Sequence, residues 1–254
     1  MTTNRMTGYD LLVRLYPAGH PRDEMLGVLE ESGRPWHTEA PSLIVGGLRA
    51  RTGAGQPVTR RWLYAARAAA LMLLTASATA PLPDLRYGTV LLSTLMIATW
   101  VCAGLAAAAV VFGARLPAFA LATSALVLCA TDQSSVPAVA GYTLAAVLLL
   151  LPGTPSPVRN PLPILLGLAW SADYLLPGWL QNALLAAVLL WTLIDERVLL
   201  AAGLALFAGL ITVTDEVAAL DSPLSALILA GWRLGAPALL VAIATTLSHH
   251  RAKI

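Results

Sequence analysis

The chain has few charged residues for its length. Of its 254 residues only 12% are Asp, Glu, Lys or Arg, and 57% are hydrophobic, whereas soluble domains are about 25% charged and roughly 45–50% apolar. A soluble fold could not cover that much apolar surface, so the composition excludes an ordinary soluble domain. The formal net charge of +2 is too small to indicate a nucleic-acid partner.

Signatures of catalysis are also missing from the sequence. It has no glycine-rich phosphate loop, no His-x-x-x-His, no Cys-x-x-Cys and no Gly-x-Ser-x-Gly elbow, so nucleotide hydrolysis, zinc chemistry and serine hydrolysis lack a motif. Cys102 and Cys129 lie inside apolar segments and are expected to be buried free thiols. His249 and His250 belong to a basic tail, where interfacial histidines are the expected interpretation. We therefore expect no cofactor and no metal site.

What the chain does have is a series of long apolar segments between Trp62 and Leu247. Since a helix needs about 20 apolar residues to cross a bilayer, they predict an all-α polytopic transmembrane bundle of about eight spans. The count is seven if one short segment is re-entrant. The predicted spans are 62–80, 89–112, 116–130, 137–151, 163–176, 180–194, 198–214 and 224–247.

The charges between the spans indicate an orientation. Residues 1–20 lack the apolar core of a signal peptide, so the N-terminus is expected to stay in the cytoplasm. Short cytoplasmic loops carry excess Lys and Arg, and with this orientation the basic residues between and after the spans fall inside. These are Arg115, Arg159, Arg197, Arg251 and Lys253. The sequence therefore predicts a multi-pass protein of the inner (cytoplasmic) membrane with both termini in the cytoplasm.

Residues 1–58 predict a small cytoplasmic helical head and linker, ahead of the bundle at 59–254. Leucines on one face predict a first helix over Tyr9–Tyr16. A second helix is expected over Arg22–Glu31, with acidic residues in the first turn, where the helix dipole favours them. A third amphipathic segment covers Pro41–Arg51. Three such short helices can bury one small core.

Three motifs of the head carry a resemblance to a known group of proteins. Leu12–Pro17 reads LVRLYP, Arg22–Leu26 reads RDEML, and Gly46–Arg51 reads GGLRAR. Their order resembles the N-terminal prefix segment of bacterial, actinobacterial-type polytopic membrane proteins that are permease-like, or are encoded near ABC-type permeases and PadR-type regulators. The likeness ends with the head. It implies a partner such as an ABC-type ATPase or permease.

The same motifs supply candidate docking residues for such a partner. These are Arg14, Tyr16, Glu24 and Met25. The proline-rich loop from Pro152 to Pro163 is a second expected docking surface.

Charged residues inside the spans are candidates for function, because a charge at a helix centre costs about 2.5–3.5 kcal/mol on insertion scales. Arg67 lies near the start of the first span and is expected to snorkel to the surface as an anchor. Arg233 lies in the last span, roughly 13 Å below its outer end at 1.5 Å per residue. Asp173 lies close to the same outer face, so the two can form an ion pair.

We expect this pair to lie in an outward-opening cavity lined by Trp170, Tyr174 and Trp232. Arg233 and Asp173 then either fix helix packing as a buried pair or bind a substrate anion or a lipid phosphate.

Helix breakers surround Arg233 in the sequence. Gly231, Gly235 and Pro237 are compatible with an unwound helix at a binding site. Small residues are also ordinary packing surfaces between membrane helices, and this second interpretation leads.

Three functions follow from these features. The leading hypothesis is a transport-related or regulatory membrane subunit that is not itself an enzyme and depends on a partner, since the chain has no ATPase motif. The second is an intramembrane lipid or isoprenoid enzyme around Asp173 and Arg233, because a carboxyl group in an apolar site can donate a proton. The third is a membrane sensor or scaffold. The lipid bilayer is the expected surrounding in all three.

Overall fold

The computed structural model divides the chain into two compact units. They are Met1–Pro57 with Leu193–Asp195, and Val58–Thr192 with Glu196–Ile254. We refer to residues 9–51 as the head and to the second unit as the bundle. The structure describes residues 9–16, 21–51, 58–82, 85, 87–88, 92–132, 135–153, 157–158, 160–170, 179–180, 182–183, 186, 190–191, 195–218 and 222–251.

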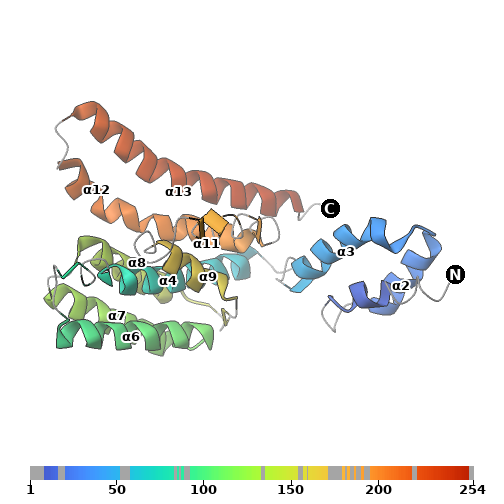
Figure 1. Ribbon diagram of the computed structural model, residues 1–254, viewed down its shortest axis with the longest axis horizontal. Helices are drawn as coiled ribbons and strands as arrows, with labels where there is room; N and C mark the ends of the chain where they lie inside the picture. The colour runs from blue at the N-terminus through green and yellow to red at the C-terminus, as the bar shows by residue number, and fades with distance from the viewer. Residues whose placement is uncertain are drawn as a thin grey trace. The chain divides into compact units, whose positions relative to one another are not determined.

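Within these described ranges every regular element is an α-helix, which confirms the all-α prediction (Figure 1). The helices of the head are α2 (Arg22–Glu31) and α3 (Trp36–Arg51), after a first helical stretch at residues 9–13. The helices of the bundle are α4 (Val58–Thr79), α6 (Thr94–Val111), α7 (Arg115–Thr131), α8 (Val136–Leu150), α9 (Leu162–Trp170), α11 (Glu196–Leu206), α12 (Ala208–Ala218) and α13 (Pro223–Arg251).

The head has a small core of its own. Tyr9, Tyr16 and Leu43 are buried, and the Tyr9 hydroxyl donates to the Arg34 carbonyl oxygen at 2.6 Å. Partly buried side chains complete this core: Leu12, Met25, Leu26, Leu29 and Ala50. The helical stretches that the leucine pattern predicted therefore meet around one core. The bounds of α2 are those predicted, whereas α3 begins at Trp36 and runs through Pro41.

Two of the sequence motifs in the head contact each other. A Cβ atom added at Gly46 would overlap the Tyr16 hydroxyl, and one added at Gly47 would lie 2.9 Å from the Leu15 Cβ. The paired glycines of GGLRAR thus let α3 approach the Leu-Tyr of LVRLYP. The packing of the head explains why small residues occur at these two positions.

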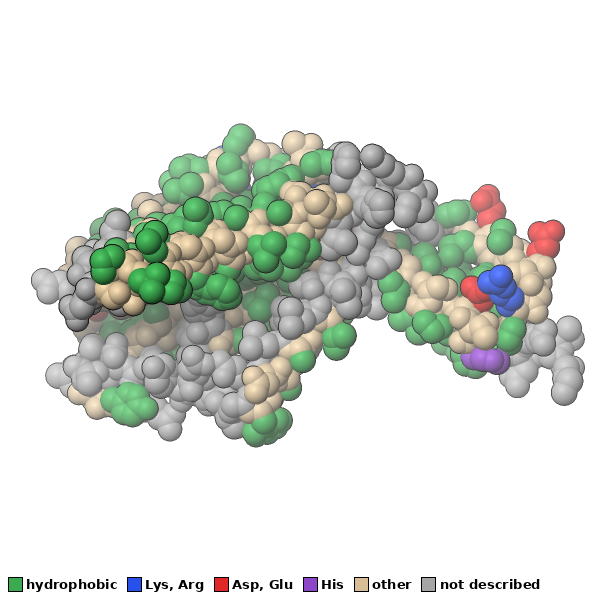
Figure 2. Space-filling model, turned by 90° about the horizontal axis from the view of Figure 1, so that it is seen from above, with side chains coloured by type: hydrophobic (Ala, Val, Ile, Leu, Met, Phe, Trp, Pro, Cys, Tyr) green, Lys and Arg blue, Asp and Glu red, His purple; other side chains and the backbone are tan. Residues whose placement is uncertain are grey.

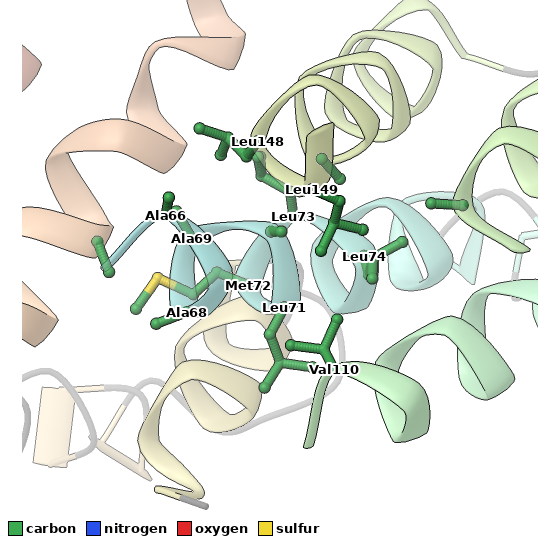
Figure 3. Close-up of a cluster of buried hydrophobic side chains, with 14 of the residues drawn as sticks. Ala66, Ala68, Ala69, Leu71, Met72, Leu73, Leu74, Val110, Leu148 and Leu149 are labelled. Carbon is green, nitrogen blue, oxygen red and sulfur yellow. The ribbon is translucent and has the colours of Figure 1, made fainter. Parts of the chain in front are cut away.

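Helix α4 lies at the centre of the bundle and contacts α6, α8, α9 and α11. It is buried at nearly every position from Tyr64 to Leu74, and Leu148 and Leu149 of α8 and Val110 of α6 lie around it (Figure 3). Alanines fill much of this stretch and let neighbouring helices approach closely, as small residues do in membrane bundles.

Two glycines on neighbouring helices bring them close to α4. A Cβ added at Gly141 of α8 would overlap the Ser77 hydroxyl, and one at Gly167 of α9 would overlap the Thr75 hydroxyl. The Thr75 hydroxyl donates a hydrogen bond within α4, to the Met72 carbonyl oxygen at 2.9 Å. Helices α8 and α9 therefore approach α4 so closely at these glycines that a side chain would not fit between them.

The remaining helices alternate in direction around this centre. Gly113 (φ +78°) makes the tight turn that reverses the chain from α6 to α7. Helix α13 runs antiparallel to α11 and α12, because Gly203 lies against Pro237, Leu240 and Val241 while Gly209 lies against Arg233.

Among the described residues, α6 and α13 are long and apolar enough to cross a membrane, at Thr94–Val111 and Pro223–Thr246. Helices α7 and α8 are apolar but shorter. Helix α9 covers the first part of the fifth predicted span, whereas residues 171–176 and most of the sixth predicted span lie outside the described residues. Eight spans therefore stay a prediction.

One finer expectation about the last spans is wrong, and for the other the structure excludes the unwound-helix alternative that the sequence ranked second. The seventh predicted span is divided at Phe207 into α11 and α12. The eighth is one continuous helix that includes Gly231, Gly235 and Pro237. Pro237 is fully buried, and the packing of α13 against α11 holds the helix together through it, so no unwound segment exists beside Arg233.

Candidate functional site

The buried charges of the bundle gather where α4 and α11 begin. Arg61, Arg67, Glu196 and Arg197 are all buried there. We call Arg61, Tyr64, Glu196 and Arg197 the α4–α11 cluster. Buried charges in an apolar bundle are costly unless they are paired, so their partners define what the cluster can do.

An ion pair forms the first contact of the cluster. The Arg61 Nη1 donates to the Glu196 Oε1 at 2.9 Å, and the two side chains are only 10% and 8% exposed. Glu196 is the first residue of α11, where a carboxylate also stabilises the positive end of the helix dipole. Removing one partner would leave an uncompensated buried charge, which costs far more than the pair itself contributes to stability.

A cation–π interaction forms the second contact. The Arg197 guanidinium carbon lies 4.2 Å from the centroid of the Tyr64 ring. Tyr64 lies three residues after Arg61 and so on the same face of α4. Consecutive residues of α11 therefore hold one face of α4 through two different interactions.

Arg67 and Arg115 add positive charge at the same end of the bundle. Arg67 is 4% exposed, so the expectation that it snorkels to the surface is wrong: α4 is enclosed by other helices and offers its side chain no path outward. Arg115 donates from Nε to the Leu149 carbonyl oxygen and from Nη2 to the Leu150 carbonyl oxygen, each at 3.0 Å. It thereby caps the last turn of α8, whose carbonyl groups lack helical partners.

These contacts place one set of helix ends together, which we call the basic end. Leu63 of α4 lies against Gly153 just beyond α8, and Gly113 lies against Pro157. Because α13 runs antiparallel to α11, its C-terminal end also lies there. The described arginines that the sequence assigned to one side, Arg115 and Arg197, do lie at one end.

The other end of the bundle carries a carboxylate. Ser93 caps α6 by accepting from the Met96 backbone N–H at 2.9 Å. Its hydroxyl lies 3.0 Å from Oδ1 of Asp132, at the end of α7, and donates to this carboxylate. The two ends of the bundle thus differ in the charges of their described residues.

The residues of the predicted outward cavity are only partly described. Arg233 is half-buried and lies over Gly209 of α12, where an added Cβ would be 2.9 Å from its Nη1. Trp232 is 71% exposed and so does not line an interior cavity. Asp173 and Tyr174 lie outside the described residues, as does the side chain of Trp170, the last residue of α9. The Arg233–Asp173 pair stays a prediction.

The predicted docking residues of the head divide into two kinds. Arg14 is exposed and pairs with Asp10 at 2.8 Å, and Glu24 is also exposed. Tyr16 and Met25 instead belong to the core of the head, where burial raises the pKa of the Tyr16 hydroxyl above its usual value. Arg14 and Glu24 are the two that a partner can contact.

Sequence reasoning missed the α4–α11 cluster. It considered Arg197 only as a basic residue between two predicted spans and gave no role to Arg61, Tyr64 or Glu196. No local pattern points to the pair, because Glu196 lies 135 residues after Arg61.

Comparison of the chain with protein-family models, with curated proteins and with solved structures found no match. Over the part of the chain that the structure describes, no group of three or more His, Cys, Asp or Glu side chains could hold a metal ion.

Proposed function

We propose that this chain is the membrane-embedded, transport-related or regulatory subunit of an assembly, and that its partner is an ABC-type ATPase or permease bound by the head. The bundle lies in the inner membrane with the basic end toward the cytoplasm. The excess of arginine at that end, with the apolar helices α6 and α13, supports this orientation.

The position of α4 is the observation that carries the proposal. Residues 52–57 alone separate the end of α3 from the start of α4, and α4 is the helix that most of the bundle contacts. The first turns of α4 hold α11 through the α4–α11 cluster. A partner bound to the head is therefore close in the chain to the helix at the centre of the bundle, whose first turns carry the α4–α11 cluster.

The head supplies the surface for that partner. It has its own small core, so its exposed residues are presented on a folded unit and not on an extended tail. The sequence resemblance of the head to permease-associated prefix segments supports the class of partner.

Site-specific cross-linking in native membranes tests this function. A photoreactive residue replaces Glu24 in the full-length chain, and the matched control replaces Glu30, which is also exposed on α2 but about 120° further around the helix. We expect a cross-link to an ATPase or permease from position 24 and not from position 30. No such cross-link from position 24, or equal cross-links from both positions, would contradict the proposal.

A further inference from the structure

The turn from α6 to α7 carries a half-buried arginine at the surface of the bundle. Arg115 is the first residue of α7, and its bonds to the carbonyl oxygens of Leu149 and Leu150 hold the guanidinium against the last turn of α8. These bonds use two of the five N–H donors of the side chain. The remaining N–H donors point in a fixed direction, because these two hydrogen bonds hold the guanidinium group in place.

Apolar residues close to this arginine are exposed: Phe112 and Leu116 lie near it in the sequence, and the Leu150 carbonyl oxygen accepts one of its hydrogen bonds. Phe112 is 83% exposed and Leu116 73%, and Leu150 is 52% exposed. In water such a group would be unfavourable. At a membrane surface the same group is favourable, because acyl chains cover the apolar side chains while the arginine reaches the level of the lipid headgroups.

The electrostatics of the basic end favour an anion beside Arg115. Arg67 is buried at the same end of the bundle, and Arg115 lies close enough to it for the two like charges to repel each other. An anion next to Arg115 offsets the repulsion between the two like charges. A guanidinium fork also matches the oxygens of a phosphate group, with which it makes parallel, charge-assisted hydrogen bonds.

We propose that Arg115 binds the phosphate of an anionic phospholipid, whose acyl chains lie over Phe112, Leu116 and Leu150. The shared chemistry is that of a phosphate group, and the apolar surroundings select the lipid over a free phosphate ion. The inference rests on the membrane-embedded bundle of the proposed function and does not depend on the partner of the head.

Binding of defined ligands to the purified full-length protein tests the site. Thermal stability in detergent is followed with added phosphatidylglycerol, phosphatidylcholine of the same acyl chains, or inorganic phosphate, and bound lipid is counted by native mass spectrometry. We expect stabilisation and retained lipid with phosphatidylglycerol alone. Equal stabilisation by phosphatidylcholine would overturn the anion requirement, and equal stabilisation by inorganic phosphate would overturn the lipid.

A charge-removing variant locates the site on Arg115. Arg115→Gln should weaken phosphatidylglycerol binding about tenfold or more, since the variant loses charge-assisted hydrogen bonds to the phosphate. Arg60→Gln removes the same charge from an exposed position at the same end of the bundle and should bind as the wild type does. Equal loss in both variants, or no loss in Arg115→Gln, would show that the basic end attracts lipid without this site.

A second variant keeps the test independent of the role of Arg115 in capping α8. Leu116→Asp places a negative charge beside the phosphate at a highly exposed position, so it should fold normally and weaken lipid binding. Val136→Asp, at an exposed position in the first turn of α8, is its control and should leave binding unchanged. Wild-type binding by Leu116→Asp would refute the site. If the lipid specificity is lost but the cross-link at position 24 is intact, the proposed function stands and the lipid site does not. If the cross-link is absent but phosphatidylglycerol binds specifically, the lipid site stands and the proposed partner does not.

Discussion

Helices α4 and α13 differ in how far they are buried within the protein. Hydropathy alone would predict the opposite order. Helix α13 is among the most apolar segments of the chain, yet only 6% of its most apolar window is buried within the protein. Helix α4 carries three arginines, yet it is buried at every position from Tyr64 to Leu74. Figure 2 shows the hydrophobic side chains exposed over the bundle on the side of α13.

The membrane setting that we propose for the bundle accounts for this difference. In a bilayer the acyl chains are as apolar as leucine, so the most hydrophobic helix gains nothing by entering the centre of a bundle. Polar groups cannot face lipid and must pair inside the protein. A helix that combines alanines with several arginines is therefore suited to the centre, and a predominantly apolar helix to the periphery.

The largest expected effect concerns the ion pair that holds α4. Arg61→Ala or Glu196→Ala should each lower the free energy of unfolding by about 3–5 kcal/mol, because the remaining charge stays buried without its partner. The measurement is unfolding by denaturing detergent in mixed micelles. The double variant Arg61→Met with Glu196→Leu should recover most of the loss. A double variant as unstable as either single one would show that the pair acts in some other way.

A smaller effect is expected from the close approach of α9 to α4. Gly167→Val should destabilise the bundle by about 1–3 kcal/mol, since its side chain meets Thr75 and the backbone of α4. Gly231→Val on α13 is the control, because nothing lies within 4 Å of an added Cβ there. Comparable stability of the two variants in the same assay would mean that α4 is less tightly enclosed than the contacts indicate.

The smallest effect is expected from the cation–π contact. Arg197→Gln should cost about 0.5–2 kcal/mol, and Tyr64→Leu should cost a similar amount. A double-mutant cycle with both changes measures the coupling between them. Additive effects in the cycle would remove this contact as a stabilising part of the α4–α11 cluster.

Local features of the molecule were predictable from the sequence. The leucine pattern and the acidic first turn gave the bounds of α2, and continuous apolar character indicated α6 and α13, because these signals depend on neighbouring residues alone. The glycine turn at Gly113 was likewise visible as the break between two apolar segments.

The central position of α4 was not predictable in the same way. It depends on partners such as Glu196, which is 135 residues from Arg61 in the sequence, and a hydropathy count treats each arginine only as a penalty. Arg67 was expected at the surface because it lies near the start of the first predicted span, and its sequence position does not show which helices enclose it. The break at Phe207 and the continuity of α13 through Pro237 are likewise set by packing between helices and not by local propensity.

Photolabelling from the lipid phase tests the central claim most directly. A hydrophobic diazirine is activated in native membranes that contain the full-length protein, and labelled residues are located by peptide mass spectrometry. The account predicts strong labelling of α13 at Leu227, Ile228 and Trp232, and none of α4 between Ala65 and Leu74. Labelling of α4 as strong as that of α13, or an unlabelled α13, would contradict a bundle built around α4 inside the membrane.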